Sequence, residues 1–368
     1  MPARPATPAA LGYRMPAEWE PHEATWLAWP HERSDWPGKF ATIPWVYGEV
    51  VRYLSQVEQV RILVGDLAME RQARRVLQKS GGNLQRVEFF HCPTDRSWTR
   101  DSCPIFVRNA AGALAMTHWR FNGWAKYGNY ARDAAIPIFL RKRLRLPYFK
   151  PMLGSRHVVL EGGSIDVNGA GVLMTTEECL LSPVQARNPT LTRQQIEEVL
   201  QQYLGVEEIL WLRNGIAGDD THGHIDDLAR FVNPSTIVIA AERDRSEVNY
   251  PALAENLRLL QATKRFHVAK LPMPKPVYFD GQRLPASYAN FYIANELVLV
   301  PVFNDPNDRR ALSLLARLMP DREIIPIYAG DLVLGLGTLH CMTQQQPQAD
   351  GRGSHGASSQ QNANQGTE

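Results

Sequence analysis

Four predicted β-hairpins recur along the chain at a nearly constant spacing, and this repetition limits the possible folds more than any other sequence feature. Their turns contain Asn109, Asn168, Asn233 and Asn295, which follow one another at intervals of about 60 residues. Asparagine suits such turns because its short polar side chain tolerates positive φ. The spacing predicts that the chain is built from repeated modules.

Helical patterns fill the intervals between these hairpins. Thr192 and Gln195 form a capping box, apolar residues follow at helical spacing, and Gly205 ends the segment. Residues 250–260 show the same pattern. Because helix and hairpin alternate, the sequence predicts an α/β fold.

The composition is that of a globular protein, with 44% hydrophobic and 21% charged residues among 368. No long Gly/Ser linker interrupts residues 13–347, so we expect one domain there. Residues 1–12 are rich in Pro and Ala, and residues 348–368 are rich in Gln, Gly, Ser and Asn. Both ends lack core-forming side chains, and we predict that they are disordered.

Charge and cysteine usage exclude several classes of partner. A net charge of +2 gives no reason to expect nucleic acid or an acidic membrane surface. No apolar run reaches the roughly 18 residues of a membrane span, and the N-terminus lacks a signal-peptide core. Cys92, Cys103, Cys179 and Cys341 show no CxxC spacing, which argues against a disulfide framework or zinc knuckle and favours a reducing cytoplasm.

Residues 218–227 concentrate four carboxylates and two imidazoles between two strand-like runs. If this segment is extended, residues two apart point to the same side, so His224 and Asp226 share a face while Ile225 turns to the core. That arrangement predicts a functional site. Asp219 and Asp220 suit a solvated acidic loop, and they are also candidates to bind a cationic group.

Carboxylates stand at matching places just before three of the predicted turns. Asp101, Glu161 and Asp226 lie seven or eight residues upstream of their asparagines, whereas the fourth unit has Tyr288 there. If the units surround an axis, the three carboxylates converge. Trp98 would add an aromatic face beside Asp101. The alternatives are a structural ion pair of Asp101 with its neighbouring arginine and a helix-capping role for Glu161.

Cys341 completes a candidate catalytic set, because it lies in a polar, Gly-rich segment where a core cysteine is unexpected. Carboxylates near a thiol raise its pKa and weaken it as a nucleophile. They make sense if the substrate is a cation. A guanidinium offers paired N–H donors that two carboxylates can grip, and its charge stabilises an attacking thiolate. The set points to hydrolysis of a guanidine.

Several motifs resemble those of the agmatine deiminases, a Porphyromonas-type peptidylarginine deiminase-like branch of the guanidino-group modifying, or pentein, superfamily. They include Met-Pro-Ala-Glu-Trp-Glu-Pro-His from residue 15, Trp-Thr-Arg-Asp from 98, Glu-Gly-Gly-Ser from 161, Thr-Glu-Glu-Cys-Leu-Leu from 176, Gly-His-Ile-Asp from 223, Ala-Ser-Tyr-Ala-Asn-Phe-Tyr from 286 and His-Cys-Met-Thr-Gln-Gln-Gln-Pro from 340. The resemblance implies a five-bladed α/β propeller of ββαβ-type modules. It also implies hydrolysis of agmatine to N-carbamoylputrescine and ammonia, a step towards putrescine and other polyamines, without metal or cofactor.

The resemblance also assigns roles to the candidate residues. Cys341 matches the family's nucleophile, His224 its general acid and base, and Glu161 the acid that orients the histidine. Asp101 and Asp226 match the acids that bind the guanidinium, and Trp98 matches an aromatic residue of the substrate channel. The implied intermediate is an amidino group bound covalently to Cys341.

Two positions depart from the family pattern. Leu-Gly-Thr-Leu at 336–339 replaces the usual Gly-Gly-Asn-Ile, so the asparagine amide next to the nucleophile is expected to be missing. Cys103 stands where a glycine is usual, and we expect it to line the pocket.

Three other functions stay open at this point. Arginine or peptidyl-arginine would need a cation for its carboxylate, for which Lys126 or Arg132 are candidates. His222, His224 and Asp226 come one residue short of an H-x-H-x-D-H zinc signature, which suits a metal-dependent hydrolase. A non-catalytic scaffold that binds a small cation would need every feature except the thiol. A homodimer is the default expectation for such a protein.

Overall fold

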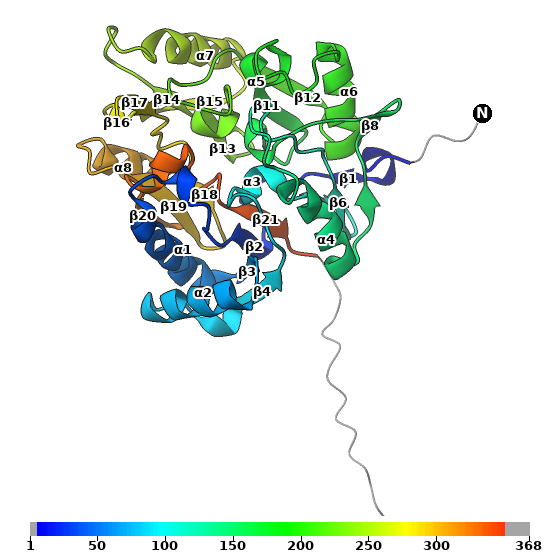
Figure 1. Cartoon of the computed structure of the whole chain (residues 1–368). Coiled ribbons are helices and arrows are strands. Elements are labelled where there is room, and N and C mark those ends of the chain that lie inside the picture. The colour runs from blue at the N-terminus through cyan, green and yellow to red at the C-terminus, as the bar shows by residue number, and fades with distance from the viewer. Residues whose placement is uncertain (1–5, 350–368) are drawn as a thin grey trace, which may run out of the picture.

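Each predicted hairpin is present in the computed structural model, which describes residues 6–349, and each continues into a third strand parallel to the second (Figure 1). The four units are β5 Ile105–Asn109, β6 Leu114–Thr117 and β7 Tyr148–Phe149; β10 Asp166–Val167, β11 Val172–Thr176 and β12 Glu208–Leu212; β13 Ala229–Asn233, β14 Thr236–Ala241 and β15 His267–Pro272; and β18 Tyr292–Ile293, β19 Leu297–Val302 and β20 Glu323–Tyr328. Between the second and third strands run α4 Ile136–Leu144, α6 Arg193–Leu204, α7 Tyr250–Ala262 and α8 Asp308–Leu318.

A fifth unit is made from the two ends of the described chain. Strand β21 (Gln344–Pro347) pairs antiparallel with β2 (His22–Ala28), which continues into the parallel strands β3 (Gln59–Val64) and β4 (Val87–His91). Figure 1 shows the red β21 directly beside the blue β2. Helices α1 (Ile43–Val57) and α2 (Leu67–Lys79) complete this unit.

The predicted capping box and terminal glycine are both present in α6. The Thr192 hydroxyl accepts from the Gln195 backbone N–H, the Gln195 side chain returns the bond, and Gly205 ends α6 with φ of 64°. The buried face of α6 includes Ile196, Leu200 and Leu204, which pack beneath the β10–β11 hairpin. Burial of one such side chain contributes about 1.5–3 kcal/mol.

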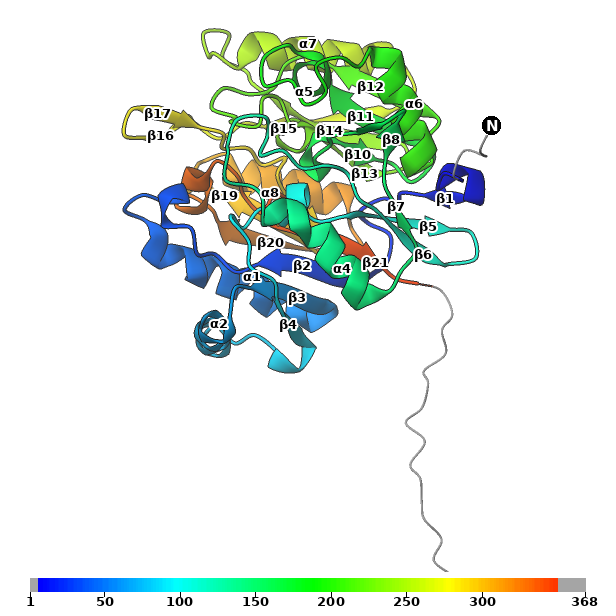
Figure 2. The same ribbon diagram turned by 45° about the vertical axis from the view of Figure 1, so that its right-hand side comes forward.

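Short connecting elements determine where polar side chains gather. Helix α3 (Thr99–Ser102) and the 3₁₀ turns η6 (Gly162–Ser164) and η7 (Ile225–Asp227) stand just before β5, β10 and β13, and η6 contacts both of the others. The carboxylates at matching repeat positions lie on or directly before these turns. The chain also forms the small pairs β1 (Tyr13–Arg14) with β5, β8 (Met152–Leu153) with β9 (Arg156–His157), and β16 (Val277–Phe279) with β17 (Gln282–Leu284). Figure 2 shows the β16–β17 hairpin projecting from the body of the molecule.

A buried ion network around Glu18 joins the units. Its Oε1 accepts from Arg230 Nη2 at 2.8 Å and from the Ile293 backbone N–H at 2.8 Å. Its Oε2 lies 3.2 Å from Arg100 Nη2 and 2.8 Å from His340 Nε2. Burial would raise the pKa of Glu18, but Arg230 and His340 outweigh it and hold the pKa well below its ordinary value.

The predicted disordered ends lie largely outside the described residues. Of residues 1–12 the structure describes 6–12, which include a 3₁₀ turn at Ala9–Leu11, and of the tail it describes residues 348 and 349. Among the helices of the described chain, none has both the length and the apolar character that crossing a bilayer requires.

Replacement of Glu18 by alanine should destabilise the protein by about 3–5 kcal/mol, because two buried guanidinium groups lose their carboxylate. Urea unfolding of the purified variant measures this loss. Glu208→Ala is the matched control, since its ion pair with Arg265 is about half exposed and should contribute about 1 kcal/mol or less. Similar losses in the two variants would contradict a special role for Glu18.

Candidate active site

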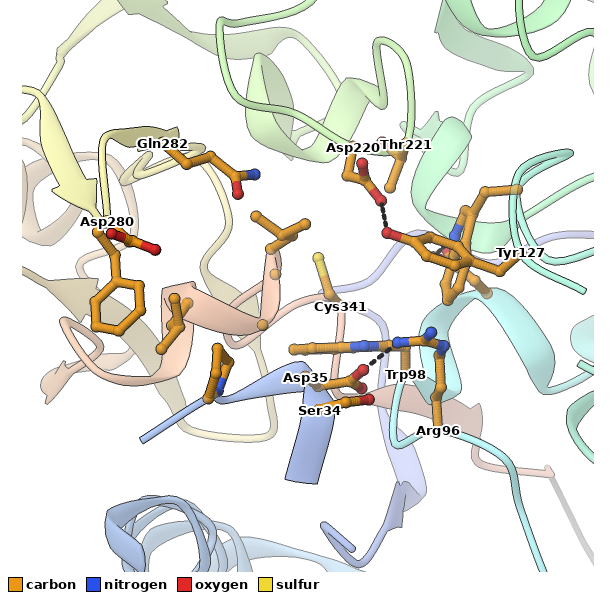
Figure 3. Close-up of a pocket in the computed structure, with 18 residues that line it drawn as sticks. Ser34, Asp35, Arg96, Trp98, Tyr127, Asp220, Thr221, Asp280, Gln282 and Cys341 are labelled. Carbon is orange, nitrogen blue, oxygen red and sulfur yellow. Dashed lines mark hydrogen bonds and ion pairs between the residues drawn. The ribbon is translucent and has the colours of Figure 1, made fainter. Parts of the chain in front are cut away.

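A cavity of about 380 Å³ opens over Cys341 (Figure 3). Its walls come from segments far apart in the chain: the stretch after β2, the turn leading into α3, the loop before α4, the loop before η7, the β16–β17 hairpin and the segment before β21. The charged and aromatic side chains that line it are Asp35, Arg96, Trp98, Asp101, Trp124, Tyr127, Asp220, Phe279 and Asp280. Four of these carry a carboxylate and one carries a guanidinium, so the pocket favours a cation.

Cys341 lies at the base of this cavity and is 7% exposed. Its Sγ lies 3.1 Å from the side-chain amide nitrogen of Asn290 and 3.8 Å from Asp226 Oδ2. Burial raises the pKa of the thiol well above its ordinary value, and the charges of Asp226, Asp227 and Asp101 raise it further. The thiol therefore needs a nearby positive charge to ionise at neutral pH.

His224 lies among the three predicted carboxylates. Its Nδ1 is 4.0 Å from Asp101 Oδ1 and 3.9 Å from Asp226 Oδ1, and its Nε2 is 3.8 Å from Glu161 Oε2. Neither ring nitrogen has a hydrogen-bond partner within the described residues. Burial would lower the pKa of His224, but Asp101, Cys179 and Glu161 outweigh it and raise the pKa well above its ordinary value. The ring is thus poised as a proton donor.

Glu161 is fixed by an arginine that the sequence analysis did not identify. Arg187 Nε donates to Glu161 Oε1 at 3.0 Å, and both side chains are fully buried. Burial would raise the pKa of Glu161, but Arg187 and His224 hold it at about 2. Arg187 also donates to the carbonyl of Thr221, in the loop that leads to His224. Arg187 therefore contacts both Glu161 and the loop that positions His224.

The two acids predicted to grip the guanidinium differ in their surroundings. Asp101 accepts from the Gly163 backbone N–H at 3.0 Å and from Trp124 Nε1 at 2.8 Å, and burial raises its pKa. Asp226 Oδ2 lies 2.7 Å from His340 Nδ1, and its Oδ1 has no hydrogen-bond partner in the described structure. Burial would raise the pKa of Asp226, but the His340 interaction lowers it.

Two sequence-based explanations at this site are wrong in detail. Residues 225–227 form the 3₁₀ turn η7, so an extended backbone is not what brings His224 and Asp226 together. Arg100 does not neutralise Asp101, since its guanidinium binds Glu18 and Gln345 instead. The Asp101 carboxylate is therefore not held in the ion pair that the sequence analysis considered.

The neighbouring carboxylates Asp219 and Asp220 have different roles in the structure. Asp219 accepts from the backbone N–H groups of Thr221, Gly223 and His224, so it stabilises the loop and does not line the cavity. Asp220 does line the cavity, where it pairs with Lys126 Nζ and accepts from Tyr127 Oη at 2.6 Å (Figure 3). Trp98 also lines the cavity, and its ring packs at a tilt of 47° against that of Trp36, with ring centroids 5.6 Å apart.

The predicted zinc signature is not assembled. His222 has φ of 63° and hydrogen-bonds through Nε2 to the Ser182 hydroxyl. Within residues 6–349, the group that could hold a metal is Glu161, Cys179 and His224, whose ligand atoms lie within 4.8 Å of one another. His222 is not part of this set, so the two histidines of the sequence motif do not form one metal site.

Both departures from the family pattern have structural explanations. Cys103 does not line the pocket as expected, because it packs in an apolar cluster with Cys92 and Met116. The amide expected to be missing beside the nucleophile is present, since Asn290 Nδ2 reaches Cys341 Sγ. Thr338 holds that amide by donating from its hydroxyl to Asn290 Oδ1 at 2.8 Å.

Sequence reasoning missed four residues that build the site: Glu18, Arg187, Asn290 and His340. Three of them lie inside motifs that resemble the family, so the motif positions themselves were an available signal. Arg187 lies in a loop without regular structure, and nothing in its neighbourhood predicts a partner 26 residues away.

A thiol, an imidazole and three carboxylates at one buried point of a mixed α/β fold define a guanidine-modifying protein with a cysteine at its centre. Comparison with known proteins agrees. The sequence pattern of the Porphyromonas-type peptidyl-arginine deiminase family matches residues 14–347, and the chain belongs to that family.

Several similar proteins are named agmatine deiminase or putative agmatine deiminase, and two similar solved structures are named as a putative peptidyl-arginine deiminase and a putative arginine deiminase. A putative agmatine deiminase of Legionella pneumophila strain Philadelphia 1 is 38% identical, and the agmatine deiminase of Pseudomonas aeruginosa strain LESB58 is 35% identical; each alignment covers 93% of this chain and 97% of the relative. The solved agmatine deiminase of Enterococcus faecalis superposes with a TM-score of 0.85 at 30% identity, covering 94% of this chain and 99% of that one.

Gly163→Ala should lower activity by about 100-fold or more, because small displacements of catalytic groups have effects of that size. An added Cβ would lie 2.6 Å from His224 Nδ1 and 2.9 Å from Asp101 Oδ1. Steady-state turnover measures the loss. Gly128→Ala is the control, since its Cβ meets nothing within 4 Å. Equal activity of both variants would contradict the importance of this close approach.

Alkylation of Cys341 by iodoacetamide should accelerate about tenfold per pH unit up to at least pH 9, because only the thiolate reacts and its raised pKa lies beyond that range. Mass spectrometry of the peptide that contains Cys341 gives the rate at each pH. A plateau near pH 7 would show that the thiol is already ionised in the free protein.

Proposed function

We propose that the protein hydrolyses agmatine to N-carbamoylputrescine and ammonia, with Cys341 as nucleophile. The observation that carries this proposal is the charge of the pocket: four carboxylates line it, and the thiol at its base ionises poorly without a cation. A guanidinium supplies that cation at the carbon to be attacked. The names of the relatives support agmatine as the substrate.

The reaction follows from the protonation states of the groups. Asp101 and Asp226 hold the guanidinium. Beside this cation the Cys341 thiol loses its proton to solvent, and the thiolate attacks the central carbon. The imidazolium of His224 gives a proton to one nitrogen, the C–N bond breaks, and ammonia leaves an amidino group on sulfur. Neutral His224 then takes a proton from water. The resulting hydroxide attacks the carbon, the C–S bond breaks and the urea product leaves.

Glu161 and Arg187 complete this mechanism without touching the reacting carbon. The carboxylate stabilises the imidazolium before ammonia leaves, and Arg187 keeps that carboxylate ionised. Asn290 places an amide N–H on the nucleophilic sulfur. Because Glu161 favours the imidazolium, His224 acts first as an acid and then as a base.

The far end of the pocket favours agmatine over arginine. An α-carboxylate would need a free cation, but Arg96 pairs with Asp35 and Lys126 pairs with Asp220. Arg132 does not line the cavity; its side chain is 66% exposed and faces Asp95. Asp220 and Asp280 instead suit an ammonium group.

We also infer that the five sheets are the blades of an α/β propeller with the site near its axis. Support comes from the shared order of strands, in which an antiparallel pair is followed by a parallel strand in every unit. A cytoplasmic location is consistent with four cysteines that form no disulfide.

Ammonia release from purified protein with agmatine, arginine and a peptidyl-arginine tests the proposal. Agmatine alone should react, and Cys341→Ala should abolish the reaction because the adduct cannot form. Release from arginine or the peptide would keep the mechanism and overturn the substrate. Activity that survives Cys341→Ala but is lost with a chelator would overturn the thiol mechanism.

A further inference from the structure

Both oxygens of the Asp220 carboxylate, at the far end of the pocket, already have partners. Lys126 Nζ binds Oδ1, and Tyr127 Oη donates to Oδ2 at 2.6 Å. The Asp220 side chain is 15% exposed and that of Lys126 is 44% exposed. A substrate ammonium that uses Asp220 must therefore replace a group that is already there. The Lys126 side chain has the same chemistry as that end of agmatine: both are a primary ammonium on a chain of four methylenes.

The segment that carries Lys126 also reaches the other end of the pocket. Trp124 Nε1 donates to Asp101, one of the two acids proposed to hold the guanidinium. Gly123, Trp124 and Ala125 have φ of 66°, 57° and 54°, so three consecutive residues adopt the left-handed conformation. Non-glycine residues rarely adopt it without support from their surroundings.

That support is present. The Ala125 backbone N–H donates to Asn122 Oδ1 at 2.9 Å, and Gln185 Nε2 donates to the carbonyls of both Trp124 and Asp220. Gln185 thus links the Lys126 segment to the loop that carries Asp220. The backbone on both sides of the Lys126–Asp220 pair is held by these hydrogen bonds, while the lysine side chain that reaches Asp220 is nearly half exposed.

We propose that Lys126 is a specificity-determining residue that occupies the ammonium position of the free enzyme and yields it only to a substrate with a terminal cation. This inference rests on the proposed function. A guanidine with an ammonium tail replaces Lys126 on Asp220, so the carboxylate stays paired and the lysine returns to water. A guanidine with a neutral tail cannot make this exchange.

The exchange is feasible because the pair is weak. A half-exposed lysine gains little from a surface ion pair, so its displacement should change substrate affinity by only about two- to fivefold. The lysine still satisfies Asp220 when the pocket is empty, which avoids a poorly hydrated, unpaired carboxylate. Tyr127 keeps its hydrogen bond to the second oxygen throughout.

The test uses Lys126→Met with two substrates of equal chain length, agmatine and n-butylguanidine, which lacks the ammonium. KM for agmatine should fall about two- to fivefold with a smaller change in kcat, whereas KM for butylguanidine should not move. Lys126→Arg should restore the wild-type KM because it keeps the ion pair. Calorimetric binding of agmatine in the Cys341→Ala background should show the same ratio for Lys126→Met without turnover.

A double-mutant cycle gives the sharpest outcome. Asp220→Asn should raise KM for agmatine only, and in that background Lys126→Met should have no further effect. Arg132→Met is the control, since this cation of the same segment pairs with Asp95 outside the pocket. An increased KM for agmatine, equal changes for both substrates, or additive effects in the cycle would overturn the inference.

The two proposals fail in different ways. Wild-type protein that releases no ammonia from agmatine would overturn both the proposed function and the role of Lys126. Active wild-type protein whose KM for agmatine is insensitive to Lys126→Met would overturn the role of Lys126 alone.

Discussion

The structure depends on one buried carboxylate, Glu18, which joins segments as far as 322 residues apart. Removing a carboxylate and two guanidinium groups from water costs several kcal/mol per ion, and only mutual pairing offsets that cost. The interaction therefore stabilises one arrangement of the units strongly over others. Through His340 it also reaches Asp226, so the framework and the acid proposed to bind the substrate are one connected network.

An excess of negative charge gives the site its chemistry. Burial raises the pKa of the Cys341 thiol, and the charges of Asp226, Asp227 and Asp101 raise it further because they disfavour a second anion. Asp101 and Glu161 also raise the pKa of the His224 imidazole, because they favour a cation. The free protein thus holds a protonated imidazole and an un-ionised thiol in one site, both close to Asp226. In the proposed mechanism, a bound guanidinium lowers the pKa of the sulfur and leaves the proton on His224, where the first step needs it.

Much of the architecture could be predicted from the sequence because its signals are local. Asparagine turns, a capping box and a terminal glycine each act over a few residues, and all four hairpins and both named helices are confirmed. The repeat spacing did not reveal the fifth unit, which only the family resemblance implied, because its antiparallel pair, β2 with β21, joins opposite ends of the chain. No spacing within the sequence reveals such a pair.

The site shows the same division between local and distant information. The repeat positions correctly predicted that Asp101, Glu161 and Asp226 converge, since each precedes its own hairpin. The partners that set their charge were not predictable from spacing, because Arg187 and His340 reach them from elsewhere in the fold. Thr338 in place of the family's asparagine predicted the loss of an amide beside the sulfur, but Asn290 supplies that amide from a distant segment and Thr338 holds it.

The pairing of β2 with β21 has a consequence for how the protein is made. A ribosome synthesises β2 early and the segment from Cys341 to Pro347 more than 300 residues later. Until then the first sheet lacks its edge strand, Glu18 lacks His340, and the carboxylate pocket has no sulfur. The step that completes the fold is therefore also the step that brings the Cys341 thiol to the carboxylates that suppress its ionisation.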